Sequence, residues 1–261
     1  MQVSAPNPNI DLYYQFHDTR RTGTEERYLS RGMGTGANLG NPLLPITRNT
    51  EVMTGINLTP GRVYLRPDFF YSFLNNYIIV NNQPQMNEMK MVMGSMDPMA
   101  PPTARSYTNI GASIYGGEMV YGFSFTNTLL LSGGGSYSRG TASSKISANV
   151  MSPNLPEMPP FRSWATLRYA RSWAFAELGA VAVDRQSQVD SDLHEVPTPG
   201  YGLLNLKLGI THRRFSGSFT LDNLLNRFYY EHFSYYRDPF AAGVKVPEPG
   251  RNFFLQVRYS F

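Results

Sequence analysis

Six methionines in one short stretch are the residues of this chain whose type and spacing point most directly to chemistry. They are half of the twelve methionines in the 261-residue sequence, and they all lie between positions 86 and 99: Met86, Met89, Met91, Met93, Met96 and Met99. Thioether sulfur is a soft ligand that prefers Cu(I), so this stretch predicts copper capture. Methionine side chains are also flexible and apolar, and an adaptable apolar surface in a loop is the alternative interpretation.

Acidic residues beside histidines form a second group with chemical potential. The neighbours are His194-Glu195 and Glu231-His232, and Asp190, Asp192 and His17 add further ligand atoms. Metal binding and a hydrolase dyad are the two chemistries that such residues support. Their spacing does not match the His-Glu-x-x-His pattern of zinc enzymes. We therefore interpret them as polar loop residues.

Composition excludes several classes of protein. Cysteine is absent, which excludes disulfides, thiolate metal sites and a cysteine nucleophile. The net charge of +4 is spread along the chain without a run of five basic residues, so nucleic acid is not an expected partner. No stretch of eighteen apolar residues occurs, which excludes a helical membrane span.

The elements that must carry these residues are strands. At the C-terminus Phe253, Leu255, Val257, Tyr259 and Phe261 alternate with mostly polar residues, a two-residue period that gives a strand one apolar and one polar face. Similar patterns predict nine strands in all, at about 51–58, 62–80, 107–122, 129–140, 162–171, 173–184, 204–210, 215–222 and 253–261.

The spacing of these strands favours an antiparallel β-barrel in a membrane. Short turns alternate with long loops, as in outer-membrane barrels, whose external loops are the long ones. Residues 1–45 show no sustained alternation, so we expect one long extracellular loop there and barrel strands over 46–261. Nine strands that begin outside form an odd number, whereas complete bacterial barrels have an even one. A soluble all-β binding module is the alternative from a different class.

The C-terminal end also carries the most specific motif: Leu221-Asp222-Asn223, then Pro249-Gly250-Arg251 and a terminal Phe261. Weaker segments precede it in order at 39–45, 109–118 and 198–201. Over residues 39–261 the chain resembles the C-terminal portion of a TonB-dependent outer-membrane receptor. Asn223 and the motif from Pro249 to Arg251, together with Phe261, are interpreted as barrel-assembly residues.

The resemblance implies the last part of a barrel of about 22 strands. It implies a location in the bacterial outer membrane, and lipid, the barrel assembly machinery and a small-molecule or metal ligand as partners. The plug that contacts the TonB complex has no counterpart here, and the N-terminus lacks the pattern of a secretory signal. We therefore expect a fragment that does not transport alone. A copper receptor and a passive porin-like channel remain as alternatives, and the resemblance does not imply an enzyme.

Overall fold

The computed structural model describes residues 2–4, 10–28, 37–38, 40–81, 104–144, 150–193, 195–236 and 244–261. Ten long antiparallel strands dominate it: β2 (Ile10–Arg21), β4 (Thr47–Leu58), β5 (Val63–Asn81), β6 (Ala104–Ser124), β7 (Leu129–Ser144), β8 (Arg162–Ala170), β9 (Ala174–Val183), β10 (Tyr201–His212), β11 (Phe215–Asp222) and β14 (Asn252–Tyr259). The shorter elements are β1 (Gln2–Ser4), α1 (Thr24–Tyr28), β3 (Ala37–Asn38), the 3₁₀ helix η1 (Ser191–Leu193), β12 (Tyr235–Tyr236) and β13 (Val244–Lys245). Among the described residues, no helix has the length and apolar character needed to cross a membrane.

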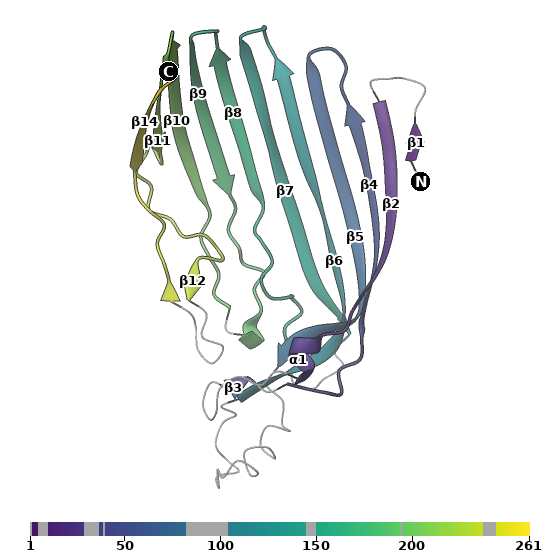
Figure 1. Ribbon diagram of the computed structural model, residues 1–261. Helices are drawn as coiled ribbons and strands as arrows, with labels where there is room; N and C mark the ends of the chain where they lie inside the picture. Colours follow the sequence, from purple (N-terminus) through teal and green to yellow (C-terminus); the bar gives the residue numbers. More distant parts are fainter. Residues whose placement is uncertain are drawn as a thin grey trace.

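The long strands form one curved sheet in which each strand pairs with the next one along the chain (Figure 1). Its order runs from β1 and β2 through β4 to β11 and ends at β14. Every residue of β14 is exposed, and within the described part of the chain it pairs only with β11. The sheet is therefore open, with β1 at one edge and β14 at the other.

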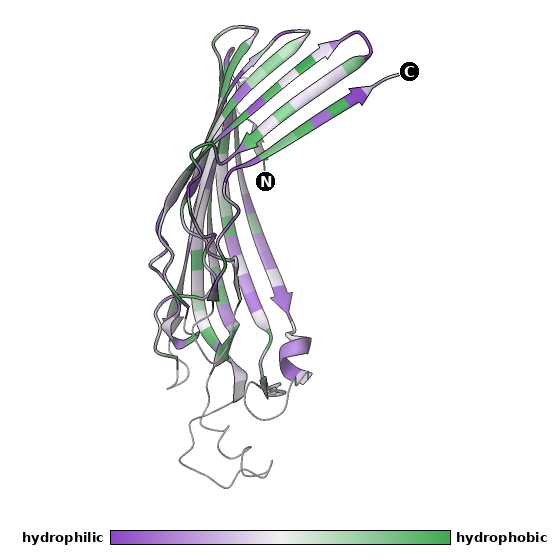
Figure 2. Cartoon of the chain, turned by 90° about the vertical axis from the view of Figure 1, so that its left-hand side faces the viewer, coloured by the Kyte–Doolittle hydropathy of each residue, from purple (hydrophilic) through white to green (hydrophobic). Residues whose placement is uncertain are grey.

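The register of the ladders separates two faces. From β4 to β5, Val52 lies opposite Tyr71, and Tyr71 in turn lies opposite Tyr115 of β6. The same face continues through Leu131 and Leu167 on β7 and β8. It then runs along β9 to β14 through Leu178, Leu206, Leu221 and Phe253. With Phe16 of β2 opposite Val52, one continuous apolar face extends across all ten long strands. Figure 2 shows the resulting alternation of hydropathy along individual strands.

The opposite face is predominantly polar. It carries Glu51 opposite Ser72, Asp68 opposite Glu118, and Arg168 opposite Glu177. Because a strand turns successive side chains to opposite sides, a residue pattern of period two is sufficient to produce both faces.

The two ends of the sheet differ in their connections. Short turns at 59–62, 125–128, 171–173 and 213–214 join the strands at one end. Gly61 and Arg213 adopt positive φ values of 59° and 52° in two of these turns. Much longer connections, 22–46, 82–103, 145–161, 184–200 and 223–251, leave the other end. The described ends of the chain both lie toward the short-turn end (Figure 1).

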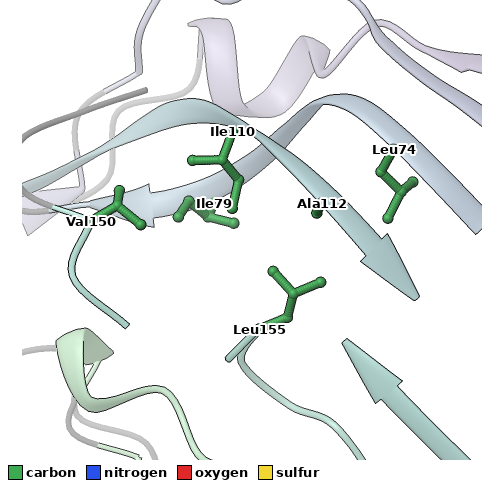
Figure 3. Packing of buried hydrophobic residues seen from close by; sticks show 6 residues of the cluster. All are labelled: Leu74, Ile79, Ile110, Ala112, Val150 and Leu155. Atoms are coloured by element: carbon green, nitrogen blue, oxygen red, sulfur yellow. The ribbon is translucent and has the colours of Figure 1, made fainter. Parts of the chain in front are cut away.

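A small conventional core lies at the long-connection end (Figure 3). Its buried members come from the extended ends of β5 and β6 and from the segment after β7: Leu74, Ile79, Ile110, Ala112, Val150 and Leu155. A β-bulge between Leu74 and Tyr77 precedes it, and Asn76 in the bulge has a positive φ of 56°. The carbonyl of Asn76 accepts hydrogen bonds from Thr47 Oγ1 and Asn109 Nδ2, both at 2.6 Å. Bulges bend strands, so β5 bends at the point where its side chains begin to contribute to this core.

Two sequence expectations are wrong at the N-terminal side. Residues 10–21 belong to a strand and not to a loop that extends from 1 to 45, so the long strands number ten and not nine. The first of them runs from the short-turn end toward the long connections, opposite to the expected entry. Ile10, Leu12, Tyr14 and Phe16 do alternate, but Tyr13 and the charged residues from Asp18 onward obscure the pattern.

Candidate functional site

The polar face of the sheet offers a wall of charged groups. Arg66 Nε lies 3.2 Å from Asp68 Oδ2 and Arg168 Nη1 lies 2.9 Å from Glu177 Oε2. About half of each arginine side chain is accessible to solvent. Ion pairs with this exposure contribute little to stability, about 0 to 1 kcal/mol. These charged groups are therefore accessible from the polar side of the sheet.

The second candidate region is a cap of three connections at the long-connection end, formed by residues 150–161, 184–200 and 223–234. Asp192 Oδ2 accepts hydrogen bonds from the backbone N–H groups of Met151 and Ser152 at 2.7 and 2.8 Å. Asn154 Nδ2 donates to the carbonyl of Val189 at 3.2 Å. Gln186 Nε2 donates to the carbonyl of Met158 at 2.6 Å. Side chains therefore connect the first two segments at several points.

Glu195 is the centre of this cap. Its Oε2 accepts the N–H of Asp190 at 2.7 Å, and its Oε1 accepts the N–H of Glu157 at 3.0 Å. The same Oε1 lies 3.2 Å from Nε2 of His232, which belongs to the third segment. Because an ionised carboxylate only accepts hydrogen bonds, His232 Nε2 carries the hydrogen. One carboxylate therefore holds all three segments together.

Thr198 completes a linear arrangement of hydroxyl, imidazole and carboxylate. Its Oγ1 lies 2.9 Å from His232 Nδ1, so the order Thr198, His232, Glu195 matches that of a catalytic triad. All three side chains are buried, with 3 to 6% of their surface exposed. A nucleophile that no substrate can reach performs no chemistry, so we assign the arrangement to stabilisation of the cap.

The pKa values of Glu195 and Asp190, two carboxyl groups of the cap, are shifted in opposite directions. Burial acts to raise the pKa of Glu195, but hydrogen bonds from His232 and from the N–H groups of Asp190 and Glu157 outweigh it and hold this pKa below the usual value. Burial raises the pKa of Asp190 to about 6, and the nearby charges of Asp192 and Glu195 act in the same direction. Glu195 is therefore held as an anion, whereas Asp190 takes up a proton at a higher pH than an ordinary aspartate does.

The histidine and acidic neighbours of the sequence are separated by the fold. Glu195 meets His232, whereas Glu231 accepts hydrogen bonds from Arg162 Nη1 and Tyr201 Oη. His17 lies on β2 and interacts with Gln15. Within the described ranges no group of three or more His, Cys, Asp or Glu side chains is arranged to hold a metal ion. His194 lies outside the described residues, as does the whole methionine stretch from Met86 to Met99.

The proposed assembly residues meet where β11 ends and β14 begins. Asn223 and Asn226 have positive φ values of 51° and 52°. Asn223 Oδ1 accepts the N–H of Arg227 at 2.7 Å, and Asn226 Oδ1 accepts the N–H of Arg251 at 3.0 Å. A Cβ on Gly250 would lie only 2.9 Å from Asn226 Oδ1, which explains glycine at that position. The two ends of the last connection are thus joined directly.

The remaining members of that group are at the surface. Pro249 is exposed and precedes this contact, and Phe261 is fully exposed beyond β14. Sequence reasoning missed Thr198, Glu157 and Gln186 as parts of the cap, because each meets a partner more than ten residues away and no local pattern marks them.

Comparison with protein families gives one match, to the TonB dependent receptor-like β-barrel, over residues 3–224. No curated protein sequence matches the chain. Among solved structures, the copper transporter OprC is 19% identical with a TM-score of 0.77, over 100% of this chain and 38% of that one.

Two siderophore receptors are similar to a comparable extent. The ferric yersiniabactin uptake receptor FyuA from Yersinia pestis is 15% identical with a TM-score of 0.70, over 98% of this chain and 36% of that one. A mutant of the ferric enterobactin receptor PfeA from Pseudomonas aeruginosa is 16% identical with a TM-score of 0.70, over 98% and 39%. At these identities the similarity establishes the fold, and the chain spans less than two fifths of each of these structures.

Proposed function

Because this chain belongs to the TonB-dependent receptor-like β-barrel family, we propose that it is the C-terminal part of an outer-membrane receptor for active uptake of a scarce ligand. Siderophores, metals and vitamins are the ligand classes that we consider. In this proposal the sheet forms part of the barrel wall, its polar face guides the ligand, and the long connections lie outside the cell. Residues 22–46 would then be extracellular, together with the cap.

The observation that carries the proposal is the pair of faces on the sheet. Apolar side chains on one face are extensively exposed, as for Phe69 at 60% and Leu255 at 73%. A soluble protein rarely exposes an apolar surface that continues across a whole sheet. Lipid is a solvent that satisfies such a face, while the backbone groups are paired within the sheet.

Partial coverage of the similar structures supports a receptor in which other segments complete the barrel and the plug. The chain spans 36 to 39% of the receptors named above. We propose that a plug domain and the remaining strands complete the receptor, that the plug contacts the TonB complex, and that the barrel assembly machinery inserts the strands. Residues 1–261 alone would then leave the edges of the sheet unpaired, so they would not transport.

Copper is the second candidate ligand. The six methionines from Met86 to Met99 supply the soft sulfur that Cu(I) prefers, and the similar structure with the TM-score of 0.77 is a copper transporter. A variant with all six replaced by leucine keeps the apolar character and removes the sulfur. Under this candidate the variant loses copper binding and uptake, whereas unchanged copper handling would contradict it.

Uptake assays distinguish active transport from passive diffusion. The complete gene product is expressed in cells that lack their own receptors, and uptake of copper, ferric siderophores and vitamin B12 is followed with and without a proton uncoupler. Active transport predicts uptake of one ligand class that stops with the uncoupler. A passive porin-like channel would be insensitive to it.

Three further measurements separate a membrane barrel from a soluble binding module and test this chain by itself. A membrane barrel partitions into detergent and changes its migration on a gel when heated, whereas a soluble binding module does neither. Uptake into liposomes by purified residues 1–261 would overturn the proposal that this chain alone does not transport a ligand. An enzyme function is not proposed, because the family is one of receptors and transporters and the Thr198–His232 pair is buried.

A further inference from the structure

The apolar face of the sheet contains a depression of about 800 Å³ over β5 to β9. This volume is within the range of about 300 to 1,000 Å³ that is usual for sites of small molecules. Most of its lining belongs to the face that carries Phe69, Tyr71 and Met119. The depression therefore opens toward lipid, on the side opposite to the polar wall.

Small residues on three neighbouring strands form its floor. Gly135 of β7 lies opposite Ser163 of β8, which lies opposite Ala182 of β9. In the next row toward the short-turn end, Ala165 lies opposite Ala180. Two adjacent rows of small side chains thus leave the space that large residues fill elsewhere on this face.

Aromatic rings give the depression a defined wall. The ring of Phe69 lies so close to Gly117 that a Cβ there would be 2.9 Å from Phe69 Cδ1. A Cβ on Gly133 would be 2.4 Å from Tyr121 Cζ. Since these rings rest on glycines of the neighbouring strand, their positions are set by the backbone of the sheet.

Arg139 is the charged residue on this face beside the depression. It lies opposite Tyr115 and two residues beyond Tyr137, and both tyrosines line the depression. Its Nε is buried and has no hydrogen-bond partner within the described part of the chain. Arg139 stands ten residues beyond Leu129, the first residue of β7. With about 3.3 Å per residue and a tilt of about 40°, it lies roughly 25 Å from the short turn, at the upper limit of an apolar band of about 25 Å.

We propose that the depression and Arg139 form a specific site for one phospholipid, whose acyl chain occupies the depression and whose phosphate pairs with the guanidinium of Arg139. Guanidinium and phosphate match in geometry and charge. Besides Tyr115 and Tyr137, the neighbours of Arg139 on the same face are Ser113 and Thr141, which are uncharged and able to donate hydrogen bonds. A single cation fits a lipid with a single phosphate better than a multiply phosphorylated glycolipid. The site rests on the proposed position of the sheet in a membrane.

Native mass spectrometry of the protein, purified from its membrane in mild detergent, tests the site. The probes are phosphatidylglycerol and a diacylglycerol with the same acyl chains. We expect one saturable phosphatidylglycerol and about tenfold weaker binding of diacylglycerol, as for loss of a hydrogen bond to a charged group. Arg139→Gln lowers phosphatidylglycerol binding to the level of diacylglycerol, whereas Arg139→Lys retains most of it.

A pair of matched variants tests whether the acyl chain occupies the depression. Ala180→Leu fills the floor and weakens the binding of both lipids, whereas Ala176→Leu, on the same face of β9 but outside the depression, leaves it unchanged. Arg214→Gln in the turn at the other end of the sheet is the control for charge. Heat-modifiable migration confirms that each variant is folded.

Three results would overturn the site: no saturable lipid, equal binding by wild type and Arg139→Gln, or a dimer of the chain that Ala180→Leu dissociates. The last would assign this face to a second copy. If the protein does not partition into membranes, the proposed function fails as well. If it partitions and transports but binds no phosphatidylglycerol, only the lipid site is wrong.

Discussion

The sheet and the cap place the same residue types in opposite ways. On the sheet, leucine and phenylalanine are exposed on one face, and the ion pairs Arg66–Asp68 and Arg168–Glu177 lie on the other. In the cap, Leu155 is 1% exposed and the polar side chains are connected by hydrogen bonds. The surrounding solvent decides the location of apolar residues: water favours their burial, whereas lipid, in which we propose that the sheet lies, favours their exposure.

The polar groups of the sheet and of the cap also differ in their exposure. Arg66 and Arg168 on the sheet form ion pairs that remain half exposed. Glu195 and His232 in the cap are buried and fully engaged. A polar group that is buried without partners costs about 1 to 3 kcal/mol, so the cap requires complementary partners, whereas the wall does not. The cap is therefore stabilised as a small water-exposed domain is, by buried apolar side chains and by buried polar groups that have hydrogen-bond partners.

Removal of a buried apolar side chain in the cap is the strongest test of this difference. Leu155→Ala leaves a cavity, and we expect it to cost about 2 to 5 kcal/mol. Leu167→Ala on the apolar face costs less, because lipid fills the vacated space and only the transfer term is lost. Amide hydrogen exchange of residues 150–161 and of β8 in detergent measures both. Equal losses would contradict the distinction.

A charge on the apolar face tests the sheet itself. Ala165→Arg, on the apolar face opposite Gly133, which lies four residues beyond the start of β7, should lower the free energy of unfolding in phospholipid vesicles by about 2 to 4 kcal/mol, the range for a cation near the middle of the bilayer. Thr166→Arg, on the polar face one residue away, is the matched control and should have little effect. The measurement is denaturant unfolding followed by heat-modifiable migration, and a reversed order of the two variants would break the assignment of faces.

The histidine contact tests how the third segment is held in the cap. His232→Ala removes the imidazole that contacts both Glu195 and Thr198 and should destabilise the cap by about 1 to 3 kcal/mol. His212→Ala removes an exposed histidine and should change nothing. Protease sensitivity of residues 184–200 and 223–234 reports the outcome. Equal sensitivity of the two variants would show that the contact has no structural role.

The pH dependence of the cap should be the smallest effect, because two carboxyl groups oppose each other. The folded pKa of Asp190 is raised from 3.8 to about 6, so its contribution is complete below 3.8 and is lost as pH rises through 6. The folded pKa of Glu195 is lowered, so its contribution is present above 4.5 and is lost as pH falls through the folded value.

We therefore expect the most stable cap on the acidic side, between about pH 4.5 and 6. Hydrogen exchange of residues 184–193, corrected for intrinsic rates, measures this. Asp190→Asn keeps an oxygen for the N–H of Asp192 and removes the change near pH 6. A wild-type profile identical to that of Asp190→Asn would refute the assignment.

Prediction from sequence worked where a strand has one apolar and one polar face. The alternation in β14 and β10 survives because one face is apolar along its whole length, and the expected ranges differ from the observed ones by only a few residues. It failed for β2, where Tyr13 is aromatic on the polar face and a charged end follows. An aromatic residue on the polar face and charged residues at the end of the strand together hid a period that is only two residues long.

The sequence by itself determined the antiparallel strands, their two faces, the alternation of short turns and long connections, and the resemblance to the receptor family. All of these follow from local patterns, because a side chain in a strand is directed by its position alone. Only the tertiary structure decided that His232 meets Glu195 and Thr198, and that the small residues of β7, β8 and β9 adjoin the aromatic wall beside Arg139. Those contacts join residues far apart along the chain, and the register that brings them together belongs to the sheet as a whole.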